Sequence, residues 1–234
     1  MSTDFIYKNK NCSQAGFSLV ELAIVLIVIG LIVGGVLKGR ELIESARLKS
    51  VLTQLNEYRV ATGTFMVRYN ALPGDFKEAK AYISDDLVDG DGDGIISGDG
   101  LRADSQARQF WAHLAAARLI PEPGSLGGDG GLATFGAGAP SAQIGGGITV
   151  EHMQDHGMYG HWFVLGLENN TKGDGALLTP LQAMSLDKKV DNGDPKSGKI
   201  RAMDGQGARV GACIQGGIYN TKSDARACIM RFQF

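Results

Sequence analysis

An apolar run near the N-terminus constrains this chain more than any other feature. From Leu22 to Leu37 the sequence contains no charged side chain, and Glu21 stands directly before the run. Residues 17–37 together make a stretch of about 21 residues, roughly 30 Å long as a helix, which matches the thickness of a bilayer core. Inserting a carboxylate into a membrane helix costs on the order of 2.5–3.5 kcal/mol, so Glu21 needs a partner or a specific role.

An N-terminal apolar segment is most often a secretory signal or a plain anchor, but the order of residues around this run argues against both. A secretory signal carries its charges before the apolar region and small residues after it. Here Gly16 comes before the run, and the acid lies at its edge. The polar residues 1–16, which include Lys8 and Lys10, are typical of a cytoplasmic leader.

The sequence from Gly16 to Glu21, Gly-Phe-Ser-Leu-Val-Glu, followed by the apolar run, resembles the prepilin leader of type IV pilins and type II secretion pseudopilins. The resemblance implies that prepilin peptidase cleaves after Gly16 and that Phe17 becomes N-methylated. Glu21 matches the family's acidic residue at the fifth mature position, which pairs with the N-terminal amine of a neighbouring subunit. Such a pair offsets the desolvation of both charges and sets the axial register between subunits.

The resemblance and the hydrophobic pattern together predict an α+β pilin fold. After Leu37, apolar residues recur at spacings of three and four, so one helix is expected to continue to Tyr69 with an amphipathic second half. That stripe contains Leu42, Ala46, Leu48, Val51, Leu52, Leu55, Tyr58, Thr62, Phe65, Met66 and Tyr69. We expect a leader at 1–16, a transmembrane or filament-core half of the helix at 17–37, an amphipathic half at 38–70, and a head at 71–234, with a small antiparallel β-sheet packed on the helix.

Glycines interrupt the middle of this predicted helix at positions 30, 34, 35 and 39. Each costs about 1 kcal/mol relative to alanine in an exposed helix. The cluster indicates either a site of easy melting in a filament or close packing of another helix, and both interpretations stay open.

Local signals predict further elements in the head. Residues 105–120 are expected to form a helix that ends before Pro121. Strands are expected at 148–150, 162–165 and 227–234. Thr179 followed by Pro180 predicts a capped short helix that reaches Val190.

An acidic, glycine-rich stretch is the strongest site signal in the head. Carboxylates alternate with glycines over residues 89–94, as in the first half of an EF-hand loop, which binds Ca²⁺ through positions 1, 3, 5 and 7. Position 12 of such a loop is Gly100, so the carboxylate one residue earlier would replace the usual glutamate. We predict Ca²⁺ ligands at Asp89, Asp91, Asp93, the carbonyl of Ile95, and Asp99. A solvated acidic turn is the alternative, but closely spaced carboxylates repel one another without a cation.

Two cysteines remain in the mature chain, because Cys12 lies in the predicted leader. Cys213 and Cys228 form an even pair on the outer side of a membrane, which predicts a disulfide. It would close a loop of about 16 residues and stabilise the fold by about 3 kcal/mol in the chain-entropy model. Two free thiols are the alternative. Type IV pilins often carry a C-terminal disulfide loop of this kind.

Composition and motifs give no support for catalysis or nucleic-acid binding. Loss of the leader changes the net charge from −2 to −3, and such a near-neutral balance predicts no nucleic-acid footprint. No nucleotide-binding loop, nucleophile elbow or zinc-protease motif is present, so we expect a protein that is not an enzyme. His152, His156 and His161 are too diffusely spaced to favour zinc over a position on a loop or strand surface, and His113 is expected to be structural. A second cation site at Asp187, Asp191 and Asp194 is less favoured than a polar helix end.

The resemblance implies a structural subunit of a type IV pilus that assembles into a homo-oligomeric helical filament and serves adhesion, motility or DNA uptake. Its partners would be prepilin peptidase and the pilus or secretion machinery. It would lie in the bacterial inner membrane as a precursor and then in an extracellular pilus, and the cysteine pair favours this interpretation. The acidic loop, and the lack of a proline after the span, favour a type II secretion pseudopilin in a periplasmic pseudopilus. A membrane-anchored Ca²⁺-binding module that never polymerises is the third possibility.

Overall fold

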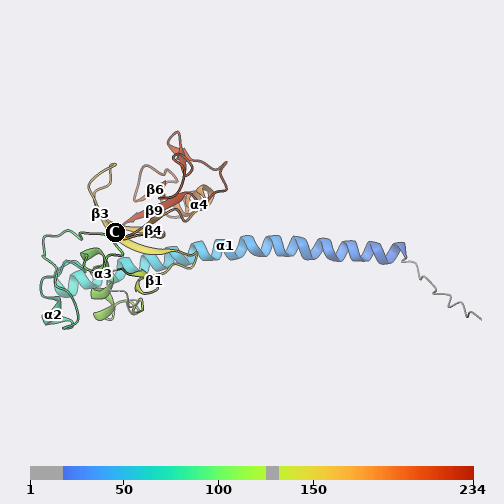
Figure 1. Ribbon diagram of the computed structural model, residues 1–234. Coiled ribbons are helices and arrows are strands. Elements are labelled where there is room, and N and C mark those ends of the chain that lie inside the picture. The colour runs from blue at the N-terminus through green and yellow to red at the C-terminus, as the bar shows by residue number, and fades with distance from the viewer. Residues whose placement is uncertain (1–17, 125–131) are drawn as a thin grey trace, which may run out of the picture. The chain divides into compact units, whose positions relative to one another are not determined.

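The computed structural model describes residues 18–124 and 132–234 (Figure 1). The predicted cleavage position between Gly16 and Phe17 therefore lies outside the described residues. The chain divides into two compact units, residues 1–44 and residues 45–234. Helix α1, Leu19–Tyr69, contributes to both units.

The described part of the first unit is the N-terminal portion of α1. This helix begins directly after Ser18, whose Oγ accepts a hydrogen bond from the N–H of Val20 at 3.3 Å. By length and composition, α1 contains a segment that could cross a membrane, as the apolar run predicts. The glycines at 30, 34, 35 and 39 lie inside continuous helix, and a Cβ added at any of them would meet no atom within 4 Å. These glycines therefore do not break the helix in the single chain.

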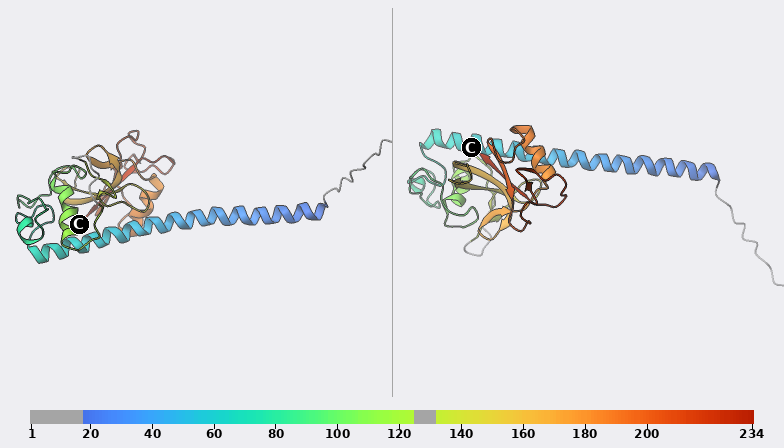
Figure 2. Two further views of the ribbon diagram at one scale, coloured as in Figure 1. Left: turned by 60° about the horizontal axis from the view of Figure 1, so that its bottom comes forward. Right: turned by 90° about the horizontal axis from the view of Figure 1, so that it is seen from above.

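The core of the second unit lies between the C-terminal part of α1, helix α3 (Gln106–Ala116) and a β-sheet (Figure 2). Aromatic side chains join these three layers. The rings of Tyr58 and Trp111 lie 4.9 Å apart, and Trp111 stacks on Phe163 of the sheet at 6.0 Å. The buried face of α1 repeats at spacings of three and four, as predicted, and consists of Leu48, Val51, Leu55, Tyr58, Ala61, Thr62 and Phe65.

Three members of the predicted stripe, Leu42, Ala46 and Met66, lie on the surface instead. Met66 is 45% exposed, and Leu42, in the first unit, is 62% exposed. Met66 directly follows the buried Phe65, and successive residues on an α-helix are about 100° apart. Phe65 points into the core, so the side chain of Met66 points about 100° away from that direction, toward the surface.

The main sheet is antiparallel throughout (Figure 1). Its strands are hydrogen-bonded in the order β3 (Gly147–Met153), β4 (Gly160–Asn169), β9 (Cys228–Gln233) and β6 (Ile200–Asp204), and β5 (Lys172–Gly175) pairs with the far end of β4. Phe163, Phe232 and Ile200 lie in register on one face and enter the core. The fold is thus α+β, with a long N-terminal helix followed by an antiparallel head, consistent with a pilin fold.

Smaller elements complete the head. They are α2 (Ala79–Tyr82), the parallel pair β1 (Thr134–Phe135) and β2 (Gly138–Ala139), and the antiparallel pair β7 (Ile214–Gln215) and β8 (Ile218–Tyr219). Helix α3 ends at Ala116, before the predicted residue 120, because Arg118 adopts a left-handed conformation with φ 59°.

Helix α4, Pro180–Val190, begins as its sequence predicts. The Thr179 hydroxyl accepts from the N–H of Gln182, and the Gln182 side chain accepts from the N–H of Thr179, which together form a capping box. Proline occupies the first turn, where a missing N–H costs nothing.

A disulfide joins Cys213 to Cys228, as predicted, with Cα atoms 5.0 Å apart. It ties the segment after β6 to the first residue of β9. Asp204, the last residue of β6, accepts hydrogen bonds from the N–H groups of Gly211 and Cys213, each at 2.7 Å. The loop is therefore held both covalently and by a carboxylate.

Candidate functional site

The first turn of α1 places Glu21 at the start of the apolar segment, residues 19–37. Ser18 caps the helix and Glu21 follows three residues later, which is the spacing of a capping box and puts an acid near the positive end of the helix dipole. Glu21 is exposed in the single chain. Its carboxylate is therefore available for a partner outside the chain.

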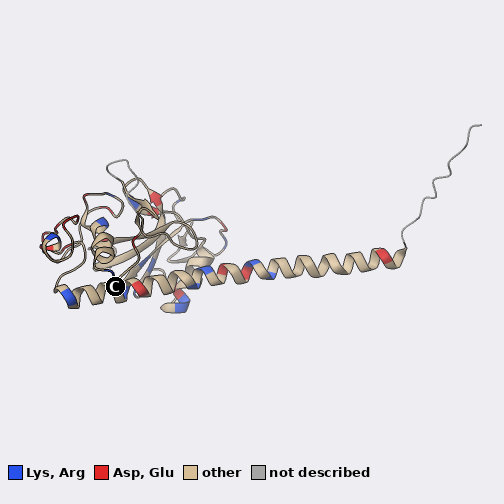
Figure 3. Cartoon of the chain, turned by 90° about the horizontal axis from the view of Figure 1, so that it is seen from below, with Lys and Arg blue, Asp and Glu red and all other residues tan. Residues whose placement is uncertain are grey.

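The apolar segment carries no other acidic or basic residue, and charges resume at Lys38 (Figure 3). Every large apolar side chain from Leu19 to Leu37 is exposed, at 47–86%. Contiguous apolar surface on this scale is not stable in water, because burial contributes about 25 cal/mol per Å² of apolar surface. The segment therefore requires a membrane or other protein chains around it.

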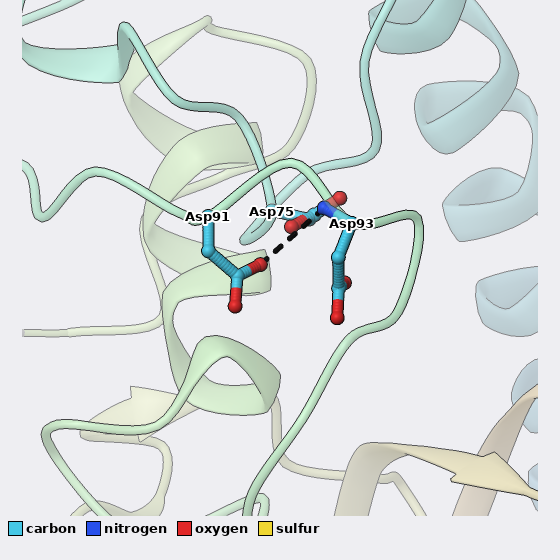
Figure 4. Close-up of side chains that lie close together, drawn as sticks. All are labelled: Asp75, Asp91 and Asp93. Atoms are coloured by element: carbon cyan, nitrogen blue, oxygen red, sulfur yellow. Dashed lines mark hydrogen bonds between the residues drawn. The ribbon is translucent and has the colours of Figure 1, made fainter.

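The acidic loop, residues 89–99, brings two of the predicted ligands together with a residue that the sequence pattern did not indicate. Ligand atoms of Asp75, Asp91 and Asp93 all lie within 4.8 Å of one another, and these three residues are called the acidic cluster below. Asp91 and Asp93 lie on the same loop, and their side chains point in the same direction. Asp75 lies on a different segment, behind the loop in this view (Figure 4).

Asp75 is the buried member of the cluster. It is 3% exposed, and its two carboxylate oxygens accept the N–H groups of Gly92 at 2.7 Å and Gly94 at 2.9 Å. Burial raises the pKa of Asp75, and the charge of Asp91 adds to this, while the two N–H donors act in the opposite direction. Asp75 therefore positions the loop, and a carboxylate retains further lone pairs for a cation.

Asp91 and Asp93 are the exposed members of the cluster. The side chain of Gln106 donates to Asp91 at 2.8 Å, and this hydrogen bond is the main cause that lowers the pKa of Asp91. Asp93 accepts the N–H of Ile95 at 2.7 Å within the loop. Three carboxylates in this space form an arrangement of hard oxygen donors, the ligand type that Ca²⁺ prefers.

The other predicted side-chain ligands, Asp89 and Asp99, make contacts outside this cluster, and the predicted ligand set stays a prediction. Asp89 accepts the N–H of Lys80 at 2.9 Å, and Asp99 accepts the hydroxyl of Thr171 and lies 3.7 Å from the amine of Lys172. Neither belongs to the acidic cluster. Ile95, whose carbonyl was the fourth predicted ligand, lies in the loop next to the cluster and donates its N–H to Asp93. Of the predicted side-chain ligands, only Asp91 and Asp93 lie within the acidic cluster.

The glycines of the loop have steric reasons of their own. A Cβ at Gly90 would lie 2.2 Å from the carbonyl carbon of Asp75, and Gly92 has a φ of 65°. Glycine is thus required where the loop crosses the Asp75 segment and where it turns. The glycines of the alternating pattern therefore have a steric cause, whether or not the acids hold a cation.

The histidines do not converge on a metal. His156 is exposed beside Asp155, whereas the Nε2 of His161 accepts the N–H of Ile96 at 3.1 Å. His152 lies next to His161, with ring centroids 4.8 Å apart. Burial, together with the neighbouring His152, lowers the pKa of His161 to about 4. Among residues 18–124 and 132–234, the acidic cluster is the only group of such side chains close enough to share an ion.

His113 is structural, as expected. It is fully buried, its Nδ1 accepts the N–H of Gly74 at 2.9 Å, and its Nε2 lies 2.9 Å from the carbonyl of Val88. Burial lowers the pKa of His113, and its neutral ring links the segment at Gly74 to the segment at Val88.

Asp187, in the last turn of α4, and Asp191 and Asp194, after it, form a polar helix end. Asp187 is buried and accepts the hydroxyl of Tyr219 at 2.8 Å. Asp191 and Asp194 accept backbone N–H groups of residues 196, 199 and 200. Each carboxylate is thus used to fix the turn that leads into β6.

Comparison with known proteins gives one match. Residues 11–37 match the prokaryotic N-terminal methylation motif, and no curated protein and no solved structure matches the chain. The match covers the predicted cleavage position, Glu21 and the apolar segment. It supports a precursor that lies in the inner membrane before processing. The chain therefore carries the prepilin-type signal of type IV pilins and pseudopilins.

Proposed function

We propose that this protein is a structural subunit of a type IV filament. Prepilin peptidase would cleave it after Gly16, and Phe17 would be N-methylated. The observation that carries the proposal is the methylation motif at residues 11–37, which coincides with an apolar helical segment whose large side chains no described residue buries. Packing these segments side by side in a filament core removes their apolar surface from water.

Glu21 supplies the register in this proposal. A carboxylate among apolar helices is costly unless a cation lies opposite, and the amine created by cleavage is the cation nearest to the start of each neighbouring helix. Only a correctly staggered neighbour would place that amine against Glu21. The pair would thus select one axial offset between subunits.

Between the two kinds of filament, we favour the type IV pilus, in which the subunit would serve adhesion, motility or DNA uptake. The disulfide-closed C-terminal loop supports this choice. A type II secretion pseudopilin is the second candidate, favoured by the acidic cluster. Deleting the gene separates them: loss of sheared surface filaments with normal exoprotein release supports the pilus, and the reverse result supports the pseudopilus.

We further propose that the acidic cluster binds Ca²⁺. The buried Asp75 lies against the exposed Asp91 and Asp93, and a divalent cation would relieve the repulsion between them. The ion would fasten the loop to the end of α1, since Asp75 follows that helix by only a few residues. A cation-free acidic turn is the competing interpretation.

Intact-mass and N-terminal peptide analysis of the protein from its native membrane tests the filament proposal. We expect a chain that begins with N-methylated Phe17. A chain that still begins at Met1, or that is cut beyond Leu37, would contradict the proposal and leave an anchored or secreted head.

A further inference from the structure

The loop between β6 and β9, residues 205–227, presents basic and apolar side chains to solvent together. It contains three basic residues and one acid. Val210 is 98% exposed and Ile218 is 70% exposed. The last turn of α4 lies beside this loop, because the buried Asp187 of that turn accepts the hydroxyl of Tyr219 at 2.8 Å. We call the exposed basic side chains of this turn and this loop the basic end: Lys188, Lys189, Arg209, Lys222 and Arg226.

The charge of the basic end is not neutralised by neighbouring acids. Within the described part of the chain, none of its five members forms an ion pair. Five basic groups less one acid, Asp224, leave a charge of +4. Residues 190–200 contain two acids and two lysines, which leaves this balance unchanged. The basic end therefore has the opposite sign to the mature chain as a whole.

The loop is held in a fixed conformation. Asp204 accepts the N–H groups of Gly211 and Cys213, each at 2.7 Å, and Cys213 is also part of the disulfide. The side chain of Asn220 donates to the carbonyl of Gly211 at 3.1 Å. Val210 thus stands on a braced backbone. A surface that is already ordered loses less conformational entropy on docking than a flexible one.

Positive and negative charge lie at opposite ends of the second unit. The loop at 205–227 and α4 lie at the end where α1 enters this unit, whereas α2 and the acidic loop lie at the end where α1 stops (Figures 1 and 2). Residues 75–93, at that far end, contain seven acids and two lysines, a charge of −5 (two minus seven). One bound Ca²⁺ would leave the far end negative.

The chain keeps the basic end close to whatever surrounds the apolar segment. Only seven residues, 38–44, separate that segment from the second unit, which begins at Ser45. Seven residues span at most about 25 Å even when fully extended. In a membrane-anchored precursor, the end of the head that carries the positive charge is thus tethered beside the lipid headgroups. An anionic surface attracts basic groups over about a Debye length, roughly 8–10 Å.

We propose that the basic end docks on an anionic lipid surface, that of the membrane in which the precursor is anchored. Each basic side chain near such a surface strengthens binding about 5-fold. Val210 and Ile218 would enter the headgroup layer, which removes their apolar surface from water. The far end would be repelled, so the head would stand in one orientation. The inference rests on the membrane anchoring in the proposed function, and it holds whether or not a filament then forms.

Quenching of a fluorescent label by lipids with a nitroxide on the headgroup tests the docking. The full chain carries C12S, which removes the one cysteine outside the buried disulfide, and is reconstituted in vesicles. The vesicles contain phosphatidylcholine alone or an equimolar mixture with phosphatidylglycerol. Q215C places the label in the loop of the basic end, and Y82C places it on α2 at the far end. We expect phosphatidylglycerol to increase quenching at Q215C and to leave quenching at Y82C unchanged.

Matched pairs of neutralising substitutions test whether the basic end is responsible. In the Q215C background, R209Q/R226Q should lower the ratio of docked to undocked heads about 25-fold, since two basic groups are lost. K77Q/K80Q removes the same charge from exposed positions at the far end and should leave quenching unchanged. K188Q/K189Q should act in the same direction as R209Q/R226Q, which keeps the test valid if one of these variants folds poorly.

Four results would overturn the docking proposal. The first two are equal quenching at Q215C in both kinds of vesicle, and equal behaviour of R209Q/R226Q and K77Q/K80Q. The third is quenching that follows the number of chains per vesicle instead of the lipid, which would assign the basic end to a second copy. The fourth is release by inorganic phosphate more effectively than by sodium chloride of equal ionic strength, which would indicate a phosphate site. A chain that does not float with the vesicles would instead contradict the anchoring itself, and with it the proposed function.

Discussion

At the scale of single residues, the three carboxylates of the acidic cluster have different environments. Asp75 is buried and holds the loop through the N–H groups of Gly92 and Gly94. Asp93 is exposed and makes only a local hydrogen bond to Ile95. Substitution at Asp93 therefore changes the charge of the cluster with little effect on the loop itself.

Replacing Asp93 by asparagine tests the Ca²⁺ proposal. Asparagine keeps an acceptor for the N–H of Ile95 but removes one carboxylate charge. We expect Ca²⁺ to raise the melting temperature of the unmodified chain and to raise that of D93N much less, while in a chelator D93N is equally or slightly more stable. Thermal unfolding in neutral detergent measures both quantities.

D85N is the matched control, since Asp85 is an exposed acid outside the cluster and should respond to Ca²⁺ as the unmodified chain does. Equal responses of all three proteins to Ca²⁺ would leave the cation-free turn as the correct interpretation.

The lowered pKa of His161 should make the stability of the fold depend on pH. Its pKa is about 4 in the folded protein and about 6.5 when unfolded, so between these values the unfolded chain binds more protons. The free energy of unfolding should therefore decrease as the pH falls from about 6.5 to about 4, by an amount on the order of 2 kcal/mol after allowance for solvent screening. His152 and Asp93 face this ring and modulate its titration.

H161Q retains an acceptor for the N–H of Ile96 without a titrating group, and its unfolding free energy should fall less over the same pH range. Denaturant unfolding followed by tryptophan fluorescence at pH 7, 5.5 and 4.5 measures this difference. Identical pH profiles of the two proteins would show that His161 is not responsible.

The acidic cluster also shows what the sequence pattern could and could not predict about a site. Alternating acids and glycines correctly indicated a carboxylate-rich loop. Asp75 was missed because it lies before that loop in the sequence and joins it only through a chain crossing. Asp75 is the single acid of the Pro73-Gly74-Asp75 turn, so no repeated pattern of acids marked it as a ligand. Contacts made by a crossing of this kind depend on the tertiary fold and leave no local periodicity.

At the scale of elements, local chemistry predicted some features of the helices and missed others, among them the whole of α2. The three- and four-residue spacing predicted the buried face of α1, and Thr179-Pro180 predicted the start of α4. The end of α3 was less predictable, since nothing in the composition of residues 117–120 shows that Arg118 turns left-handed. The strand order was not predictable, because pairing depends on contacts between segments distant in sequence.

The capping box of α4 predicts a measurable contribution to stability. T179A removes the hydroxyl that accepts the N–H of Gln182, and we expect a loss of about 1 kcal/mol in the free energy of unfolding. For a unit of this size that corresponds to a decrease of about 2–4 °C in melting temperature. T179S keeps the hydroxyl and should remain close to the unmodified protein. A loss in T179S as large as that in T179A would assign the effect to side-chain packing.

At the scale of the whole molecule, Glu21 has two roles that one substitution can separate. As the acid three residues after Ser18 it can support the helix start, and as a charge it can pair with the amine of a neighbouring subunit. Glutamine preserves the first role, because it serves equally in a capping box, and it removes the second.

E21Q should therefore be processed at Gly16 normally but should fail to assemble. E41Q is the control, because Glu41 lies on the same helix in an exposed ion pair with Lys38 at 2.7 Å, outside the apolar segment. Mass analysis of the N-terminus reports processing, and electron microscopy of sheared material reports filaments. If E21Q forms normal filaments, charge pairing at Glu21 is not needed for assembly. If neither E21Q nor the unmodified chain forms filaments, the anchored module is favoured.

The position of β9 has a consequence for the timing of folding. β9 is the last strand of the main sheet in chain order, yet it lies between β4 and β6. In the proposed filament subunit the head crosses the membrane, and until residues 228–233 have crossed, β4 and β6 have no strand to join them and Cys228 cannot meet Cys213. The apolar segment precedes the whole head in chain order, and the strand that joins β4 to β6 follows both of them. If the head is exported as proposed, its sheet can close only after β9 has crossed the membrane, so chaperones of the outer compartment would meet the head as a tethered, unfinished sheet.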